Sequence, residues 1–254
     1  MADAFTAWLS ALEKRHLANL TFQEVRRSVQ ALSAIYVENR NRLDSGAVLN
    51  GAGKRAAFAL FYAPLHFLLI REIVRALNAA EKTPSTIVDL GCGTGVAGAA
   101  WALEFEDRSP KLIGMDVNSW TIQEAQWTYR TFGLTGTARV GDARKLRIPD
   151  RAGVVAAFTI NELDEESRAA MLQRLLDSRD RGCSILVVEP IARRVNRWWD
   201  SWTAAFQDGG GRQDEWRFRV ELPDNLKLMD KAAGLDHREL TGRSLWLEGA
   251  APIG

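Results

Sequence analysis

The sequence is poor in the residues that form disulfides or bind metals. Its 254 residues contain 2 cysteines, Cys92 and Cys183, which lie far apart, and 3 scattered histidines. Two distant cysteines cannot build a disulfide framework, and no cysteine or histidine spacing matches a metal site. We therefore expect a protein without a metal centre, in a reducing, cytoplasmic setting.

The sequence also lacks a targeting signal, a membrane-length apolar run and a large net charge. Its first residues include the acid Asp3 and no basic segment, which is untypical of a signal peptide. The longest apolar run, residues 56–70, is shorter than the ~20 residues of a membrane span and contains Pro64 and His66. It predicts a buried helix and no membrane partner. A net charge of +1 offers no global argument for a nucleic-acid partner.

What the sequence does contain is a change of pattern near residues 82–84. Before this point the pattern is helical: Thr21 and Glu24 have capping-box spacing, and apolar residues follow at helical intervals. A later apolar helix is expected to be interrupted at Pro64. We predict an N-terminal helical cap region over residues 1–82 and a second domain over residues 83–254.

In the second domain, short apolar runs alternate with helical ones. We predict strands at residues 86–90, 111–117, 137–143, 153–161, 183–190, 216–223 and 238–249, with helices between most of them. Such alternation is typical of an α/β fold with helices on both faces of a parallel sheet. The predicted fold is Rossmann-like, with a mostly parallel seven-stranded sheet whose last strand is antiparallel.

The stretch DLGCGTG follows the first predicted strand and opens a helix. Its glycines, Gly91, Gly93 and Gly95, have the spacing G-x-G-x-G, whereas a dinucleotide fingerprint is G-x-G-x-x-G/A. Val96 stands where the last glycine or alanine of that fingerprint would fall. Asp89 would repel a pyrophosphate and attract a cationic amine. The loop therefore favours a positively charged cofactor over a nicotinamide dinucleotide, so a nicotinamide-dependent oxidoreductase is a poor alternative.

An acid followed by G-x-G-x-G resembles the first motif of the class I S-adenosylmethionine-dependent methyltransferases, and the resemblance extends over roughly residues 86–248. It implies S-adenosylmethionine as the cofactor. By this resemblance Asp89 and the loop amides meet the methionine end, Asp116 meets the ribose hydroxyls, and Asp142 meets the adenine amino group. The implied cofactor residues are Asp89, Gly91, Cys92, Gly93, Thr94, Gly95, Asp116, Val117, Asp142, Ala143 and Thr159. The alternative is that these acids are helix caps and turn residues.

The end of the fourth predicted strand, which borders the methyl group in this fold, carries the candidate catalytic residues. Asn161 could hold an acceptor amine or hydroxyl, and Glu162 could take its proton. Alternatively, Asn161 and Asp164 cap the next helix. The sequence TINEL lacks the Asn/Asp-Pro-Pro-Tyr signature of amino-methyltransferases, and no cysteine is suitably placed for pyrimidine methylation. We therefore predict methyl transfer to an oxygen or nitrogen of a small or medium-sized acceptor.

Two segments could form the acceptor pocket. Residues 191–216 are predicted to form a lid or acceptor-side insertion, in which arginine and tryptophan suit an aromatic or acidic acceptor. In the N-terminal region, Tyr62 and His66 are spaced i, i+4. The candidate substrate-binding residues are Tyr62, His66, Arg194, Trp198, Trp199 and Trp202. Alternatively, the tryptophans fill the seam with the N-terminal helices, and His66 is a core residue.

A second, narrower resemblance is to the methyltransferase-like family associated with the mitochondrial small ribosomal subunit. It rests on the helical N-terminal region, the strand ending in NEL and the strand LVVEP, but this chain lacks that family's cysteine cluster. The alternative function is therefore a ribosome- or rRNA-associated protein with little catalysis. Its basic surface would comprise Arg144, Lys145, Arg147, Arg151, Arg193, Arg194 and Arg197. The oligomeric state and the acceptor atom stay open.

Overall fold

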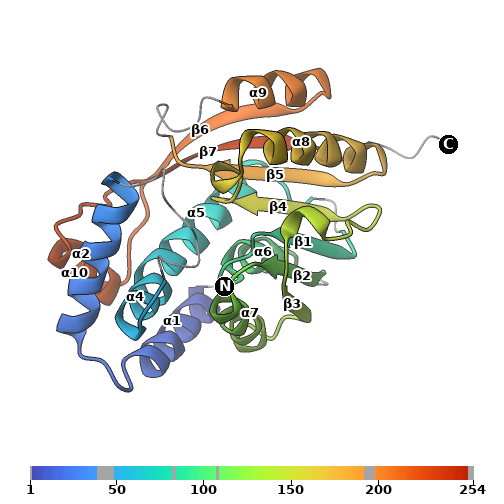
Figure 1. Cartoon of the computed structure of the whole chain (residues 1–254). Coiled ribbons are helices and arrows are strands. Elements are labelled where there is room, and N and C mark those ends of the chain that lie inside the picture. Colours follow the sequence, from blue (N-terminus) through green and yellow to red (C-terminus); the bar gives the residue numbers. More distant parts are fainter. Residues whose placement is uncertain (1, 39–48, 82–83, 107–108, 192–197, 251–254) are drawn as a thin grey trace.

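A seven-stranded sheet forms the centre of the protein (Figure 1). The computed structural model describes residues 2–38, 49–81, 84–106, 109–191 and 198–250. The strand order is β3-β2-β1-β4-β5-β7-β6. The strands are β1 (Thr86–Leu90), β2 (Lys111–Asp116), β3 (Gly136–Val140), β4 (Gly153–Ala157), β5 (Ser184–Glu189), β6 (Arg212–Phe218) and β7 (Leu240–Leu247). The first five are parallel, and β7 runs antiparallel to β5 and β6, as predicted.

The sixth strand begins earlier than predicted. It spans Arg212–Phe218 rather than residues 216–223, because its ladder with β7 runs only from Arg212 to Phe218. Residues 212–216 therefore belong to the sheet and not to a lid. The last strand inserts between β5 and β6, so the final pair is not a simple hairpin at the edge.

Helices cover both faces of the sheet, as the alternating pattern predicted. One face carries α5 (Ala63–Ala76), α6 (Val96–Ala102) and α7 (Ser119–Thr131), and the other carries α8 (Glu165–Asp180) and α9 (Trp199–Asp208) (Figure 1). Successive strand residues point to opposite faces. Leu186 accordingly belongs to the core on the first face, and Ile185 to the core on the second. Both faces of the sheet are therefore apolar.

The N-terminal helices share the core of the first face. They are α1 (Ala2–His16), α2 (Phe22–Glu38), α4 (Ala52–Ala57) and the π-helical turn η2 (Phe58–Tyr62). Trp8 of α1 stacks on Phe67 and Phe132 with ring centroids 5.8 and 5.2 Å apart. Helix α10 (Asp224–Ala232), from between the last two strands, lies beside α2 (Figure 1), and Gln30 Nε2 donates to the Ala232 carbonyl at 3.1 Å. One continuous hydrophobic core thus crosses the boundary predicted at residue 82.

The predicted interruption at Pro64 is wrong in position and in kind. The helix is continuous over Ala52–Ala76, and a π-helical turn at Phe58–Tyr62 lies directly before the proline. Proline has no N–H to donate and its ring crowds the preceding turn, so a wider turn accommodates it without ending the helix. Among the described residues this helix is the one long and apolar enough to cross a membrane by length and composition, yet 72% of its most apolar window is buried in the protein.

Side chains at the starts of three helices accept hydrogen bonds from backbone N–H groups, as expected of helix caps. Glu24 Oε2 accepts from the Thr21 backbone N–H at 2.7 Å, which completes a capping box at the start of α2. Asn118 Oδ1 accepts from the Trp120 N–H at 2.9 Å and caps α7. Asp164 Oδ1 accepts from the Ser167 N–H at 2.7 Å and caps α8. These caps place α7 directly after β2 and α8 directly after the connection that follows β4.

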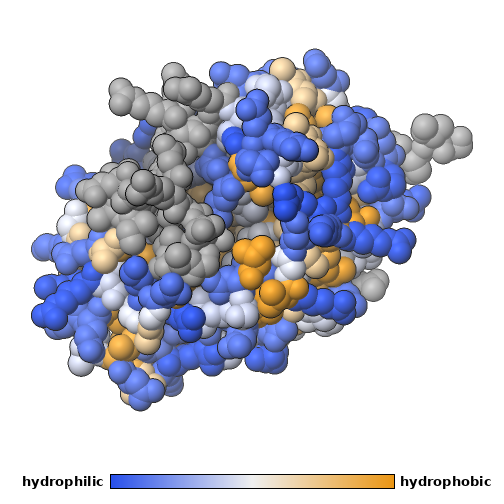
Figure 2. Space-filling view, in the orientation of Figure 1, coloured by the Kyte–Doolittle hydropathy of each residue, from blue (hydrophilic) through white to orange (hydrophobic). Residues whose placement is uncertain are grey.

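The visible surface is largely hydrophilic, with a small group of apolar side chains near its centre (Figure 2). Among the described residues, the exposed large apolar side chains are Val117, Val140 and Leu228. Isolated exposed apolar residues are ordinary in folded proteins. Val117 is of interest because it directly follows the end of β2, at the edge where the predicted site residues lie.

Candidate functional site

The glycine loop after β1 requires glycine at all three positions. Gly91, Gly93 and Gly95 have φ angles of 66°, 50° and 79°, which are left-handed conformations. A Cβ on Gly91 would lie 2.4 Å from Thr159 Cγ2, and one on Gly95 would lie 2.7 Å from Tyr129 Cε1. A Cβ on Gly93 would meet no atom within 4 Å. The outer glycines therefore serve close packing, whereas Gly93 faces open space that a ligand could fill.

Asp116 connects the end of β2 to this loop. Its Oδ2 accepts from the Gly93 N–H at 3.0 Å, and its Oδ1 accepts from the Asn118 N–H at 2.8 Å. The side chain is half-buried, and the neighbouring Val117 is 60% exposed. Each carboxylate oxygen has a second lone pair. The site can therefore offer acceptors to sugar hydroxyls and an apolar surface to a base.

Asp89 lies beneath the loop and not at its surface. It is 1% exposed, and its Oδ2 accepts from the Gly98 N–H at 2.8 Å, in the first turn of α6. Burial raises the pKa of this carboxyl to about 7; the Gly98 hydrogen bond opposes the shift and the negative charge of Asp116 adds to it. The contact that the structure shows is with the helix start, and the predicted contact with a cofactor amine stays a prediction.

The buried position of Asp89 leads to a pH-dependent stability. The pKa of its carboxyl rises from 3.8 to about 7 on folding, which corresponds to about 4 kcal/mol. Because the folded state holds the proton more tightly, the ionisation penalty is absent below about pH 4, grows up to about pH 7 and is constant above it. The free energy of unfolding of Asp89→Asn should therefore decrease less with rising pH than that of the wild type. Urea unfolding of both proteins at several pH values checks this; a pH-independent difference would contradict it.

The two side chains inside the loop are buried. Cys92 is buried, its backbone N–H donates to the Met115 carbonyl at 3.1 Å, and a Cβ on Gly114 would lie 2.8 Å from its sulfur. Thr94 is 4% exposed, and its Oγ1 has no hydrogen-bond partner among the described residues. A buried hydroxyl without a partner costs free energy that a polar ligand can recover. Together with the space above Gly93, this fits a polar cofactor such as S-adenosylmethionine.

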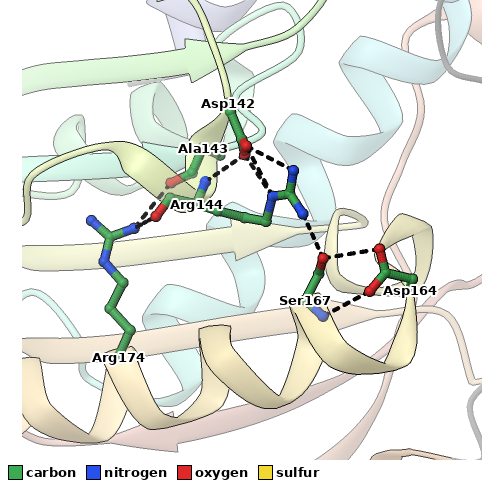
Figure 3. Close-up of polar contacts among 6 residues, drawn as sticks. All are labelled: Asp142, Ala143, Arg144, Asp164, Ser167 and Arg174. Atoms are coloured by element: carbon green, nitrogen blue, oxygen red, sulfur yellow. Dashed lines mark hydrogen bonds and ion pairs between the residues drawn. The ribbon is translucent and has the colours of Figure 1, made fainter.

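Asp142 is bound to its own neighbour (Figure 3). It accepts from the Arg144 backbone N–H at 2.9 Å and forms an ion pair with the Arg144 guanidinium at 2.8 Å, which also donates to Ser167 Oγ. The Ala143 carbonyl accepts from Arg174 at 3.3 Å. The Arg144 partner lowers the pKa of the Asp142 carboxyl. These contacts are those of a turn acid, and the predicted adenine contact stays a prediction.

The residues after β4, numbers 158–162, form what we call the β4 connection. Phe158 directly follows the strand and has a φ of 58°, a left-handed conformation that is rare for a bulky residue; its N–H donates to the Val188 carbonyl at 2.8 Å. Thr159 Oγ1 donates to the Gly91 carbonyl at 3.3 Å. The β4 connection therefore packs on the glycine loop. Sequence reasoning missed Phe158, because nothing local predicts a left-handed phenylalanine; such strain is common at functional sites.

Asn161 does not cap a helix but binds a buried acid, Glu189. Its backbone N–H donates to Glu189 Oε1 at 3.1 Å and its Nδ2 donates to Glu189 Oε2 at 2.5 Å. Its Oδ1 accepts from Trp198 Nε1 at 3.0 Å. Glu189 ends β5 and is fully buried, and burial raises the pKa of its carboxyl to about 8. Sequence reasoning missed this residue, although an acid at the end of an apolar strand was a usable signal.

Glu162 is the accessible carboxyl of the β4 connection. It is exposed to solvent, and nearby protein atoms remove part of the water around its carboxyl. This partial desolvation raises the pKa of its carboxyl to about 7, and the charge of Asp116 adds to the effect. A carboxyl of this kind can exchange a proton near neutral pH.

Tyr62 and His66 lie together near the β4 connection. The His66 ring stacks on Phe158 with centroids 4.2 Å apart, and the Tyr62 ring lies 6.3 Å from it. Desolvation lowers the pKa of His66 to about 4, helped by the charge of His237, so the imidazole is neutral at pH 7. Burial raises the pKa of Tyr62 to about 12. Tyr62 is the last residue of the π-helical turn, and such turns are frequent at functional sites.

The same helix reaches the end of β2. Phe58 packs edge-on against Trp120 at 6.4 Å, and the Arg55 guanidinium lies 5.7 Å over the Trp120 ring. We call the set Trp120, Phe58, Tyr62, His66 and Phe158 the aromatic row. It runs from the start of α7 to the β4 connection and closes one side of the predicted site.

The tryptophans after β5 pack in the core of the opposite face. Trp199 and Trp202 are 3% and 2% exposed, and Trp202 stacks on Phe206. They contact the α9 face of the sheet and not the N-terminal helices, which corrects the expected packing partner. Their burial leaves them little surface for an acceptor. Trp198 is half-buried and contacts Asn161, and Arg194 lies outside the described residues.

Gly93→Ala tests the open space in the glycine loop. A methyl group there would fill the predicted cofactor space, so we expect affinity for S-adenosylhomocysteine to fall at least about tenfold. Gly133→Ala is the matched control, because Gly133 also has a left-handed φ (69°) and a Cβ added to it would meet no atom within 4 Å. Both variants should lose about 1 kcal/mol of stability to backbone strain. Isothermal titration calorimetry measures the affinities; equal affinities in the two variants would contradict the placement.

Comparison with known proteins agrees with this geometry. Residues 87–180 match the family model of a methyltransferase domain. A Listeria monocytogenes protein assigned as a class I S-adenosylmethionine-dependent methyltransferase aligns with a TM-score of 0.54 at 12% identity, over 100% of this chain and 90% of that one. This match shows a shared fold. No curated protein matches the chain.

Two further solved structures are similar at lower scores. A Pyrococcus horikoshii protein assigned as an RNA methyltransferase aligns with a TM-score of 0.48 at 12% identity, over 80% of this chain and 87% of that one. Magnesium protoporphyrin IX methyltransferase from Synechocystis, solved with bound S-adenosylmethionine, aligns with a TM-score of 0.48 at 14% identity, over 87% and 97% of the two chains. Fold similarity alone leaves the acceptor open.

Proposed function

Since residues 87–180 carry a methyltransferase domain on the class I S-adenosylmethionine-dependent methyltransferase fold, we propose that this chain methylates an oxygen or nitrogen atom of a small or medium-sized acceptor. The cofactor of this domain is S-adenosylmethionine. The proposed acceptor site lies at the edge of the sheet, beside Glu162 of the β4 connection and the aromatic row. The observation that carries the proposal is the Asp116–Gly93 hydrogen bond beside open space, because it joins two strand ends into one cradle.

The chain's own groups around that cradle account for cofactor binding. Gly93 leaves room for close approach, and the unpartnered Thr94 hydroxyl offers a donor and an acceptor. Asp116 offers lone pairs to the ribose hydroxyls, and Val117 offers an apolar surface to the adenine. When bound, S-adenosylmethionine supplies a methyl group activated by a sulfonium. The protein then has to orient the acceptor and exclude water.

The acceptor side combines a proton acceptor with apolar walls. Glu162 has a pKa near 7 and can accept the proton that an attacking hydroxyl or amine loses. Neutral His66 and Phe158 form an uncharged wall. A neutral wall favours an acceptor that is aromatic or apolar around its nucleophilic atom. Asn161 has a positioning role, because its side-chain amide is already hydrogen-bonded to Glu189 and Trp198.

A ribosome- or rRNA-associated role is the weaker alternative. Of the basic residues considered for it, Arg144 is paired with Asp142, and its guanidinium also donates to Ser167 (Figure 3). An arginine whose positive charge is offset by a paired carboxylate contributes little to phosphate binding. Three other members of that set, Arg193, Arg194 and Arg197, lie outside the described residues.

Methyl-labelled S-adenosylmethionine tests the proposal directly. The protein is incubated with the labelled cofactor and either a small-molecule extract or total RNA, and label transferred to each is measured. We expect transfer to the small-molecule fraction, and a fall of at least about tenfold in Glu162→Gln without loss of S-adenosylhomocysteine binding. Thermal shifts with S-adenosylhomocysteine and with NAD test the cofactor separately. A shift with NAD alone would refute the cofactor site, and transfer to RNA alone would favour the alternative.

A further inference from the structure

One buried carboxylate binds both donors of a residue in the β4 connection. Glu189 is fully buried at the end of β5, and Asn161 donates to its two oxygens from the backbone N–H and from Nδ2. A buried acid is tolerated when hydrogen bonds compensate the loss of water around it. Asn161 alone donates to both Glu189 oxygens, so two hydrogen bonds fix its position and orientation.

The same asparagine extends the network to α9. Its Oδ1 accepts from Trp198 Nε1 at 3.0 Å, so the amide has its oxygen toward a donor and its nitrogen toward an acceptor. The residue that begins the α9 segment is thereby held against the β4 connection. Arg168 lies 5.6 Å over the Trp198 ring and adds a contact from α8.

An arginine on β7 supplies the opposing charge. Arg243 pairs in register with Glu189, is 4% exposed, and has its guanidinium 4.0 Å over the Trp199 ring. Its positive charge favours the ionised form of Glu189. The positive charge of Arg243 thus acts on Glu189 from β7, while the Glu189 carboxyl binds the β4 connection through Asn161.

The β4 connection needs such support because its backbone is strained. Phe158 has a left-handed φ of 58°, which is unfavourable for a bulky residue and persists only where surrounding contacts enforce it. Thr159 binds the glycine loop from one side, and Asn161 binds Glu189 from the other. The strained residue directly precedes these two anchors, donates its own N–H to the Val188 carbonyl at 2.8 Å, and carries the ring that stacks on His66.

We propose that Glu189 is a positioning residue for methyl transfer: through Asn161 it sets the β4 connection, and with it Phe158 and Glu162, at the edge where the acceptor binds. The inference rests on the proposed function in that this edge faces the methyl group. It assigns Glu189 no contact with acceptor or cofactor. A glutamine at position 189 would present a donor to Asn161 Nδ2, itself a donor, and one of the two anchoring hydrogen bonds would be lost.

A reciprocal exchange of the two side chains provides the test. Glu189→Gln places two donors face to face, and Asn161→Asp places two carboxylates face to face. In the double variant, the new amide at 189 donates to the new carboxylate at 161, which still accepts from Trp198. We measure hydrogen–deuterium exchange of the backbone amides in residues 158–162. We expect it to be at least about tenfold faster in each single variant and within about threefold of wild type in the double variant.

Transfer of label in the assay described above should follow the same order. At saturating cofactor the rate should fall at least about tenfold in Glu189→Gln and recover in the double variant, while S-adenosylhomocysteine affinity changes less than about threefold. Fast exchange with unchanged transfer, or a double variant no better than the single ones, would overturn the positioning role. If Glu189→Gln does not fold, Trp198→Phe removes the indole donor and should speed exchange about threefold; unchanged exchange would then overturn it. Failure of the wild-type protein to bind S-adenosylhomocysteine would refute only the proposed function.

Discussion

Replacing Asp116 by alanine should weaken the binding of S-adenosylhomocysteine by at least about a hundredfold. The carboxylate holds the Gly93 amide and the Asn118 amide, so its loss both removes the predicted ribose acceptor and releases the glycine loop. Hydrogen bonds to charged groups contribute about 1.5–3 kcal/mol each, and about 3 kcal/mol corresponds to a hundredfold change in affinity. Isothermal titration calorimetry at constant pH and salt measures the effect.

Asp150→Ala is the control for this variant. Asp150 is also an acid with a defined partner, Arg181 at 3.0 Å, but it is exposed and lies away from the carboxyl ends of the strands. Its removal should leave the affinity unchanged, since an exposed ion pair contributes at most about 1 kcal/mol to stability. If Asp116→Ala bound the ligand as tightly as Asp150→Ala, the cofactor site would have to lie elsewhere on the molecule.

Replacing Trp8 by alanine should lower the free energy of unfolding by about 3–5 kcal/mol, the usual range for a buried aromatic residue. Trp8 is 1% exposed and packs on Phe5, Phe67 and Phe132. Its ring joins α1 to α5 and to the end of α7. Because one core includes the N-terminal helices and the sheet, we expect a single cooperative unfolding transition that shifts as a whole in urea.

Trp127→Ala provides the matched control on α7. Trp127 is only half-buried and carries the Arg15 guanidinium 5.3 Å over its ring, so its removal should cost less than about 2 kcal/mol. Circular dichroism and tryptophan fluorescence should report the same midpoint for each variant. Two separate transitions, of which only one shifts in Trp8→Ala, would show that residues 1–82 unfold as a separate domain.

Much of the fold and the cofactor loop could be predicted from the sequence, because the signals are local. Alternating apolar runs predicted the parallel sheet, and the capping box of Thr21 and Glu24 marked a helix start. The glycine spacing and the acids near the ends of β1 and β2 predicted one edge of the sheet as the site. Parallel strands bring their carboxyl ends to one edge, so residues 23 apart in sequence, Gly93 and Asp116, meet there.

The sequence by itself determined the order of strands and helices and the left-handed glycine loop, since periodicity, caps and glycine act over a few neighbouring residues. Tertiary structure alone decided that Asp89 is buried against α6, that Phe158 is left-handed, and that Asn161 binds Glu189 rather than capping a helix. Each of these depends on which strands are adjacent and which groups burial leaves without water. Such partners lie far apart along the chain, and no local pattern specifies them.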